Sequence, residues 1–293
     1  MEREKTDRLT VIKFNGGKRE SFQDVLIAEV PLTIFLDAEE LVTILCTPEL
    51  LRELAVGFLY SEGFIHEKED IRGIDVDLGE YTVRVETRRG VVSGEVTPGR
   101  TPVAPGGPSP EGRAALLKRK LLITPGCVNA AVSVGRDGPA GDAGEGSAPD
   151  GGLKMVESDL ALCAEEIVRT VRETHRRSRL YQETGGVHNA ALCKGGRVMF
   201  FSEDIGRHNA LDKVIGLALL AGLPREDTLV VTSGRISSAV VAKMVRAKVP
   251  VLVSRSAPTS EAARLAEAFG ITLIGFARGA RFNVYSNSRR IEP

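Results

Sequence analysis

The stretches DTLVVTSGRISSAVVAKMVRAK, residues 227–248, and VPVLVSRSAPTSEAARLAEAFG, residues 249–270, decide the fold of this chain. Each begins with a short apolar run, continues through a loop of serine, threonine, glycine and arginine, and ends in a segment with apolar residues at helical spacing. Apolar runs this continuous are typical of strands that are buried on both faces. The repeated order of strand, loop and helix therefore predicts an α/β layer.

The same alternation continues on both sides of these stretches. Strands of this kind lie in one sheet, and the helices between them cover its faces. We therefore predict an α/β domain over residues 153–293. The further segments that support it are a helix over 158–177, strands over 187–193 and 197–202, a helix over 209–222 and strands within 271–286.

The first part of the chain has a different pattern. Residues 30–46 predict two short strands around an acidic turn, and the alternating residues 73–90 predict a hairpin. Between them, Thr47-Pro48-Glu49 has the composition of a helix start, with a capping hydroxyl, a proline and an acid near the positive end of the helix dipole. We predict a β-rich N-terminal portion over residues 1–112.

Two stretches rich in glycine and proline, residues 101–112 and 135–152, separate these parts. Neither contains enough apolar surface to offset the entropy of ordering, so we expect both to be mobile. Cys127 lies between them. The sequence thus predicts a mobile cysteine-bearing segment over residues 113–152.

Composition limits the class of protein. The 293 residues are 42% hydrophobic and 27% charged, an ordinary balance for one large domain or two modest ones. No apolar run reaches the roughly 18 residues of a membrane span, and the charged N-terminus does not resemble a signal peptide. We expect a cytoplasmic protein that binds neither membrane nor nucleic acid. The four cysteines form no CxxC pair, which fits a reducing compartment.

Charge is unevenly distributed along the chain. Residues 151–293 contain 21 Lys+Arg against 14 Asp+Glu, a net charge of +7, whereas residues 1–150 contain 18 against 25, a net charge of −7. The later part therefore favours an anionic ligand.

The loops that follow the two apolar runs have the groups that bind phosphate. Hydroxyls, backbone N–H groups at a helix start and guanidinium groups all suit such an anion, and ligands of open α/β sheets bind beyond the carboxyl ends of the strands. Helix capping by serine and threonine is the alternative explanation. The candidates in these loops are Thr232, Ser233, Gly234, Arg235 and Arg255.

Two further segments are candidates for a site. SEDIGRHNALDK, residues 202–213, places Arg207 and His208 among several ionisable groups after a strand. His188 lies on a strand that follows two glycines. The alternatives are a solvated helix start for the first segment and an ordinary core histidine for the second.

Absent motifs exclude several function classes. The sequence has no GxxxxGK[ST], GxGxxG, GxSxG or HExxH, which removes the motif-based case for nucleotide hydrolysis, hydride transfer, esterase activity and zinc proteolysis. His188 is not followed by the glutamate and PCxxC of a zinc deaminase. We expect no metal site.

Taken together, AVGFLYSEGFI, TGGVHNAAL, SEDIGRHNALDKVIG and the run from TSGRISS to FARGARFNVY resemble the formate dehydrogenase accessory sulfurtransferase family, FdhD. The resemblance covers about residues 30–286. It implies a cytoplasmic homodimer and a C-terminal three-layer α/β domain similar to the cytidine deaminase fold. It also implies a sulfurtransferase that takes persulfide sulfur from a cysteine desulfurase to bis-molybdopterin guanine dinucleotide and so activates formate dehydrogenase.

The resemblance also implies roles for residues. Cys127 falls at the position of the family's persulfide cysteine, although Ala130 replaces the second cysteine of the family's CxxC pair. One thiolate is sufficient to hold a persulfide, whereas a second thiol would resolve it into a disulfide. The family's guanine dinucleotide segment corresponds to Phe276, Ala277, Arg278, Gly279, Ala280 and Arg281.

Two other functions are consistent with the sequence. A chaperone could hold the dinucleotide and dock on the apoenzyme without moving sulfur, and the missing second cysteine favours this alternative. A sugar-phosphate isomerase would explain the two serine- and threonine-rich loops, but neither Cys127 nor the FARGARFNVY segment.

Overall fold

The computed structural model describes residues 4–88, 122–123 and 153–292, and a six-stranded mixed sheet forms the centre of the last part. The strand order is β10-β9-β11-β12-β13-β14. The pairs β11 with β12 and β12 with β13 are parallel, and the other neighbours are antiparallel. The strands are β9 (His188–Lys194), β10 (Arg197–Asp204), β11 (Leu229–Thr232), β12 (Val251–Ser254), β13 (Thr272–Arg278) and β14 (Arg281–Ser286).

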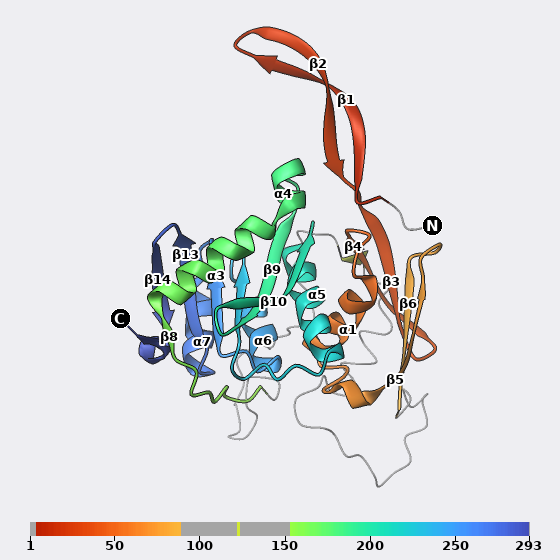
Figure 1. Ribbon diagram of the computed structural model, residues 1–293. Coiled ribbons are helices and arrows are strands. Elements are labelled where there is room, and N and C mark those ends of the chain that lie inside the picture. Colours follow the sequence, from red (N-terminus) through yellow and green to blue (C-terminus); the bar gives the residue numbers. More distant parts are fainter. Residues whose placement is uncertain (1–3, 89–121, 124–152, 293) are drawn as a thin grey trace, which may run out of the picture.

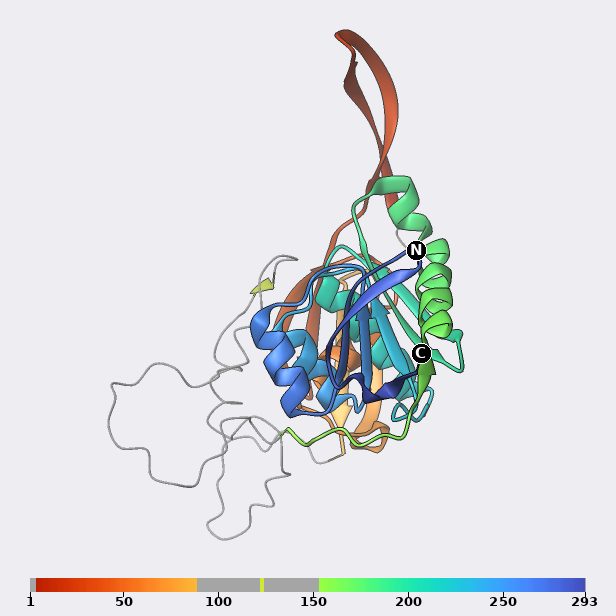
Figure 2. The same ribbon diagram turned by 90° about the vertical axis from the view of Figure 1, so that its left-hand side faces the viewer.

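Helices cover both faces of this sheet, so that the C-terminal part has three layers (Figures 1 and 2). The strands β11 and β12 are buried along their whole length, as their apolar sequences predict. The α/β prediction is confirmed, while the likeness to the cytidine deaminase fold stays a prediction. One face carries α3 (Ala164–Arg177), followed by the short α4 (Arg179–Thr184), and the other carries α5 (Arg207–Leu220), α6 (Ser238–Arg246) and α7 (Ser260–Ala268).

Among the residues that the structure describes, the N-terminal part contains a second sheet and the helix α1. The strand order of this sheet is β5-β6-β3-β4-β7, and the helix α1 (Leu51–Ser61) lies between the sheet and α5 (Figure 1). The predicted strands of residues 30–46 and 73–90 are confirmed. Their bounds are β3 (Val30–Leu36), β4 (Glu39–Cys46), β5 (Ile71–Asp77), β6 (Thr82–Thr87) and β7 (Leu122–Ile123), with a 3₁₀ turn η1 (Lys68–Asp70) before β5.

The helices α1 and α5 join the two parts. Gly57 and Gly216 allow their backbones to approach so closely that a Cβ on Gly57 would lie 1.8 Å from the Asp212 carbonyl oxygen. A single hydrophobic cluster continues from Val30 in β3 to Leu273 in β13. The described residues of both parts therefore share this cluster, while a second cluster lies within the C-terminal part. The boundaries 1–112, 113–152 and 153–293 stay predictions.

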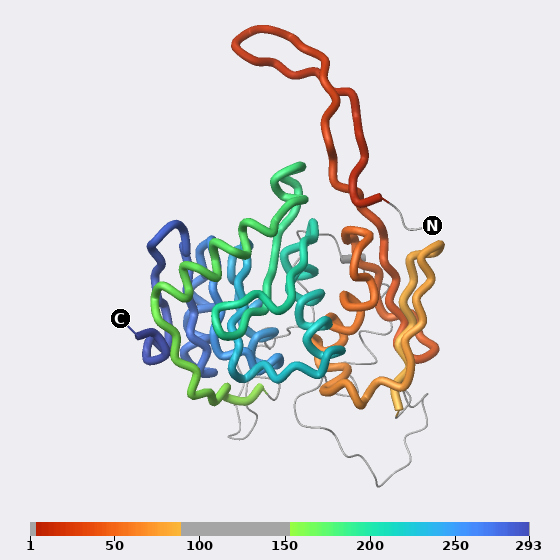
Figure 3. Tube along the Cα trace, in the orientation of Figure 1, coloured from red at the N-terminus to blue at the C-terminus, as the bar shows by residue number. Residues whose placement is uncertain are grey.

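A hairpin that the sequence did not predict projects from the rest of the molecule (Figures 1 and 3). It consists of β1 (Thr6–Asn15) and β2 (Lys18–Ile27), which pair with each other and with no further strand of the described residues. Large apolar side chains on it are exposed, including Leu9 at 55% and Phe14 at 72%. A two-stranded hairpin of this kind is at most marginally stable alone.

Two predicted helix starts are wrong. Thr47 does not cap α1, because the Thr47 hydroxyl is bonded to the Asp204 carboxylate. The N-cap of α1 is Leu50, in a left-handed conformation. The helix predicted over 158–177 begins at Ala164, because β8 (Leu162–Cys163) pairs with the final strand β15 (Ile291–Glu292), which follows the 3₁₀ turn η2 (Ser288–Arg290). Within the parts of the chain that the structure describes, no helix is both long and apolar enough to cross a bilayer.

Candidate functional site

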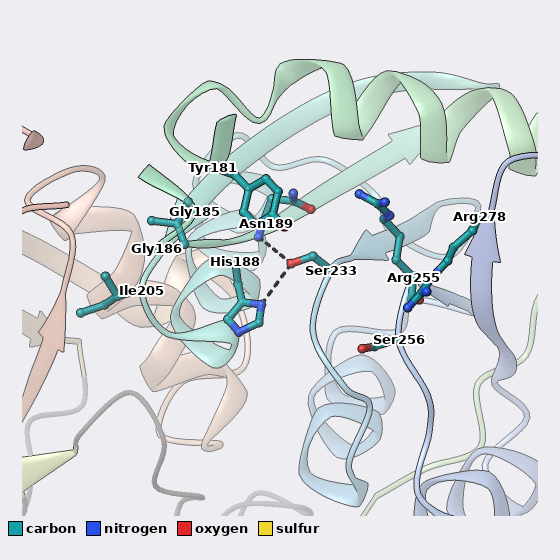
Figure 4. A pocket seen from close by; sticks show the side chains of 11 residues that line it. Tyr181, Gly185, Gly186, His188, Asn189, Ile205, Ser233, Arg255, Ser256 and Arg278 are labelled. Atoms are coloured by element: carbon teal, nitrogen blue, oxygen red, sulfur yellow. Dashed lines mark hydrogen bonds between the residues drawn. The ribbon is translucent and has the colours of Figure 1, made fainter. Parts of the chain in front are cut away.

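A pocket of about 370 Å³ opens beyond the carboxyl ends of β11 and β12 (Figure 4). This is the edge at which the sequence placed the serine-rich and arginine-containing loops, and the parallel pairing of β11, β12 and β13 brings those loops together. The pocket is lined by Tyr181, Gly185, Gly186, Val187, His188, Asn189, Ile205, Ser233, Arg255, Ser256 and Arg278.

His188 and Ser233 form the polar centre of the pocket. The His188 Nδ1 lies 3.1 Å from the Ser233 Oγ, and the same Oγ accepts the backbone N–H of Asn189 at 3.0 Å. Burial and the nearby Arg207 guanidinium lower the pKa of His188, while Asp204 opposes them. His188 is therefore neutral near pH 7 and presents one ring N–H and one ring lone pair.

A buried carboxylate positions the wall of the pocket. Glu203 accepts hydrogen bonds from the Ser178 hydroxyl at 2.7 Å and from the Tyr181 backbone N–H at 3.0 Å. The Ser178 hydroxyl in turn accepts a bond from the Asn189 side chain at 2.7 Å. This network fixes α4 and the start of β9 against each other, so the Tyr181 ring is held at the rim (Figure 4).

Two guanidinium groups make one side of the pocket basic. The Arg278 Nε donates to the Arg255 carbonyl oxygen at 3.0 Å, and the Arg255 side chain contacts the His175 ring nitrogen at 2.7 Å. Both guanidinium groups lie on the side of the pocket formed by the ends of β12 and β13 (Figure 4). Planar forks of N–H donors suit carboxylate and phosphate oxygens.

Arg207 and His208 lie beside the pocket, at the start of α5, but are not among its lining residues. The Arg207 side chain packs so closely on Gly234 that a Cβ there would lie 2.8 Å from the Arg207 Cβ. Burial, with Lys243, Arg207 and His188 nearby, lowers the pKa of His208 to about 3. Among the described residues, neither ring nitrogen of His208 has a hydrogen-bond partner, although both are buried.

Other ionisable groups of the 202–213 segment form internal contacts. Asp204 pairs with Lys213 at 2.6 Å, and both side chains are 0% exposed. Asp212 pairs with Lys243 at 2.8 Å, where burial lowers the pKa of Lys243 but Asp212 and Glu62 outweigh it, so that the pKa is raised. The charged residues of this segment thus form buried ion pairs that stabilise the helix packing below the pocket, in addition to those that lie beside the pocket.

The segment 276–281 spans the end of β13, the turn after it and the first residue of β14. Phe276 has a positive φ of 52°, is 41% exposed, and donates its backbone N–H to Ser256. Arg278 is the member of the segment that lines the pocket. The side chain of Ala277 is buried in the sheet, Gly279 with a φ of 62° and Ala280 form the turn to β14, and Arg281 pairs in register with Arg278.

The loop after β11 supplies one lining residue, Ser233. Thr232 is buried, where its hydroxyl donates to the Asn189 carbonyl oxygen, and Gly234 donates its N–H back to the Thr232 hydroxyl. Arg235 is exposed. These contacts explain part of the polar composition of the loop without a ligand, as the capping alternative proposed.

Cys127 and Ala130 lie outside the described residues. Two of the other cysteines are buried thiols: burial, with Asp204 nearby, raises the pKa of Cys46 to about 12, and burial raises that of Cys193 to about 12. Because the thiolate is the reactive form, neither thiol suits sulfur chemistry near pH 7. Cys163 is half-buried in β8.

Sequence reasoning missed Tyr181 and His175. Tyr181 lies in a six-residue helix within a polar stretch, and His175 lies in the RETHRR run that ends α3. Basic residues are common at the ends of helices, where they complement the dipole, so His175 carried no local signal.

Comparison with known proteins places this geometry in a family. The model of the FdhD/NarQ family matches residues 27–105 and 118–292. The sulfur carrier protein FdhD of Listeria monocytogenes is 36% identical over 281 residues, which cover 95% of this chain and 96% of the relative. That of Bacillus subtilis is 33% identical over 291 residues, which cover 97% and 98%.

A solved structure has the same fold. The crystal structure of a formate dehydrogenase accessory protein from Desulfotalea psychrophila superposes with a TM-score of 0.74 at 25% identity. The match covers 99% of this chain and 100% of that one.

Proposed function

Because the chain belongs to the FdhD/NarQ family, we propose that it is a sulfur carrier protein that serves formate dehydrogenase maturation. The names of its relatives, sulfur carrier protein FdhD and formate dehydrogenase accessory protein, support this role. The finer proposal is a sulfurtransferase that takes sulfur from a cysteine desulfurase to bis-molybdopterin guanine dinucleotide, its substrate.

The sulfur is held by Cys127 in this proposal. Its thiolate attacks the outer sulfur of a desulfurase persulfide, so that the S–S bond to the donor breaks, a new S–S bond to Cys127 forms, and the donor thiolate leaves. This exchange needs no external oxidant or reductant. The raised pKa values of Cys46 and Cys193 support the choice of Cys127, because those two thiols are protonated near pH 7.

The basic pocket is the observation on which the proposed acceptor site rests. Arg255 and Arg278 suit the phosphates of a guanine dinucleotide, and the Tyr181 ring on the opposite wall suits stacking with a flat base. His188 and Ser233 provide donors and acceptors between them. Phe276, Ala277, Gly279, Ala280, Arg281, Thr232, Gly234, Arg235, Arg207 and His208 stay proposed cofactor-binding residues around this pocket.

The proposed partners are a cysteine desulfurase, a formate dehydrogenase apoenzyme and a second copy of this chain, in the cytoplasm. The exposed apolar side chains of the β1–β2 hairpin support the homodimer, since Leu9, Phe14 and Phe22 are at least 41% exposed on a hairpin that pairs with no other strand of the described chain. Two copies that exchanged these hairpins would bury those side chains.

Mass spectrometry of the intact protein tests the sulfur step. After incubation with a cysteine desulfurase and cysteine, the wild type should gain one sulfur, about 32 Da, and Cys127→Ala should gain none, because the thiolate is the sulfur nucleophile. Cys163→Ala is the matched control and should behave as the wild type. A gain that persisted in Cys127→Ala would exclude Cys127 as the carrier.

Formate dehydrogenase activation separates the sulfur carrier from the chaperone alternative. A chaperone that only holds the dinucleotide would support activation in the Cys127→Ala form, whereas the proposed carrier would not. GDP binding should be unchanged in the same variant under either function, which shows that the pocket is intact.

A further inference from the structure

His175 holds one of the two pocket arginines. It lies in the last turn of α3, outside the pocket, and its Nδ1 is 2.7 Å from the Arg255 Nη1. The backbone of Arg255 is fixed as well, since its N–H donates to the Thr232 carbonyl oxygen and its own carbonyl accepts from Arg278. The direction of the guanidinium therefore depends on the contact with His175.

This contact requires a neutral imidazole. A guanidinium has five N–H donors and no acceptor, so the Nδ1 must contribute a lone pair and the proton must sit on Nε2. Burial and the Arg255 charge lower the pKa of His175 in agreement with this geometry.

The groups around His175 do not reverse its preference for the neutral imidazole. Arg255 approaches from the loop after β12, and the Tyr181 ring of α4 lies 6.3 Å away, centroid to centroid. On α3 itself, Arg176 and Arg177 share the last turn and are both paired with Glu173. The end of the helix favours a protonated ring, but a guanidinium in direct contact opposes it more strongly.

We propose that His175 is a positioning residue: its neutral imidazole directs the Arg255 guanidinium to receive a phosphate group of a nucleoside diphosphate in the pocket. The identity of the ligand rests on the proposed function, whereas the pairing does not. When His175 is protonated, Nδ1 loses its lone pair and the two side chains repel each other. Arg255 then turns away, and phosphate binding weakens as the pH falls.

Calorimetric titration of the full chain with GDP at pH 8.0, 6.5 and 5.0 tests the proposal. His175→Gln keeps an acceptor that does not titrate, His175→Phe keeps a ring without an acceptor, and His66→Gln replaces an exposed histidine elsewhere. The phosphate groups of GDP also titrate near pH 6, but they do so equally with every variant.

Because the pKa of His175 lies below its ordinary 6.5, the affinity of the wild type and of His66→Gln should fall several-fold more than that of His175→Gln between pH 8.0 and 5.0. At pH 8.0, His175→Phe should bind about tenfold more weakly than the wild type, while His175→Gln restores most of the difference. Equal pH profiles for wild type and His175→Gln, or wild-type affinity in His175→Phe, would overturn the positioning role and leave the proposed function intact.

A measurement without ligand further separates the positioning role of His175 from the proposed function of the protein. In ¹⁵N NMR spectra at pH 7, the His175 ring should carry its proton on Nε2. A proton on Nδ1 would overturn the inference alone. If that tautomer were correct but the wild type bound neither GDP nor pyrophosphate at pH 8.0, both the phosphate pocket and its positioning residue would be rejected, while the sulfur step at Cys127 would stand on its own test.

Discussion

Gly57 of α1 and Gly216 of α5 lie in direct backbone contact, so that a Cβ on Gly216 would lie 3.0 Å from the Gly57 nitrogen and 2.0 Å from the Glu53 carbonyl oxygen. The obstacles are backbone atoms, which have no side-chain rotamer by which to move aside. The two helices must therefore separate to accept even a methyl group. This contact holds the N-terminal sheet against the helices below the pocket.

We accordingly expect Gly57→Ala and Gly216→Ala each to lower the free energy of unfolding by about 1–3 kcal/mol or more, since overpacking a core typically costs this much. Urea unfolding followed by circular dichroism measures the change. Gly73→Ala is the control, because the new Cβ there would meet its nearest atom at an ordinary 3.7 Å. Wild-type stability in both helix variants would contradict the close contact.

The buried pair Asp204 and Lys213 predicts a large effect from removing one charge. Lys213→Met should destabilise the protein by about 3–5 kcal/mol, because the Asp204 carboxylate is left buried without its counter-charge. Lys248→Met removes one partner of an exposed pair with Glu226 and should cost less than about 1 kcal/mol. Chemical denaturation of both variants at pH 7 measures the two losses of unfolding free energy. Similar losses would contradict the prediction that burial of the ion pair makes the loss of one charge costly.

His208 predicts that the protein is destabilised by mild acid. Its pKa is about 3 in the folded state, below the ordinary 6.5, so the unfolded chain binds the proton more readily. The full free energy of unfolding is therefore present above pH 6.5. It decreases as the pH falls toward 3, by up to about 1.4 kcal/mol for each pH unit, because the buried His208 ring resists protonation. The lowered pKa values of His188 and His175 act in the same direction.

His208→Gln should therefore reduce the dependence of unfolding free energy on pH between 7.5 and 5.0, as measured by urea unfolding at several pH values. His66→Gln, at an exposed histidine, should leave that dependence as it is in the wild type. An unchanged slope in His208→Gln would show that its ring is not held neutral.

The hairpin predicts a change in oligomeric state. Replacement of Leu9 and Phe22 together by aspartate should convert the proposed dimer to a monomer in sedimentation velocity, because charges would replace apolar side chains in the contact. Leu78→Asp, at a comparably exposed leucine away from the hairpin, should leave the dimer intact. A dimer that survives the double replacement would require another interface.

The sequence predicted the α/β layer and the edge of the pocket because both follow from local patterns. The apolar runs 229–232 and 251–254 are long enough to be buried strands and too short to be helices, and the polar loops that follow them must then meet at one edge. Ser233 and Arg255 were found in this way.

The remainder depends on contacts between distant residues. Thr47 has every local mark of a helix cap, yet its hydroxyl is bonded to Asp204, 157 positions further along the chain. His175 is one basic residue among several until the fold brings Arg255 beside it. The β1–β2 hairpin is apolar on parts of both faces, so it lacks the strict alternation that marks a strand with one buried face.

The Thr47–Asp204–Lys213 contact also has a consequence for the order of folding. During synthesis the N-terminal sheet and α1 emerge long before β10 and α5, and the partners that would satisfy Thr47 do not yet exist. Closing so long a loop has a high entropic cost, so contacts of this separation form late and slow the overall rate. We expect the contact of Thr47 with Asp204 and Lys213 to form only in the last, rate-limiting step, after most of the polypeptide has been made.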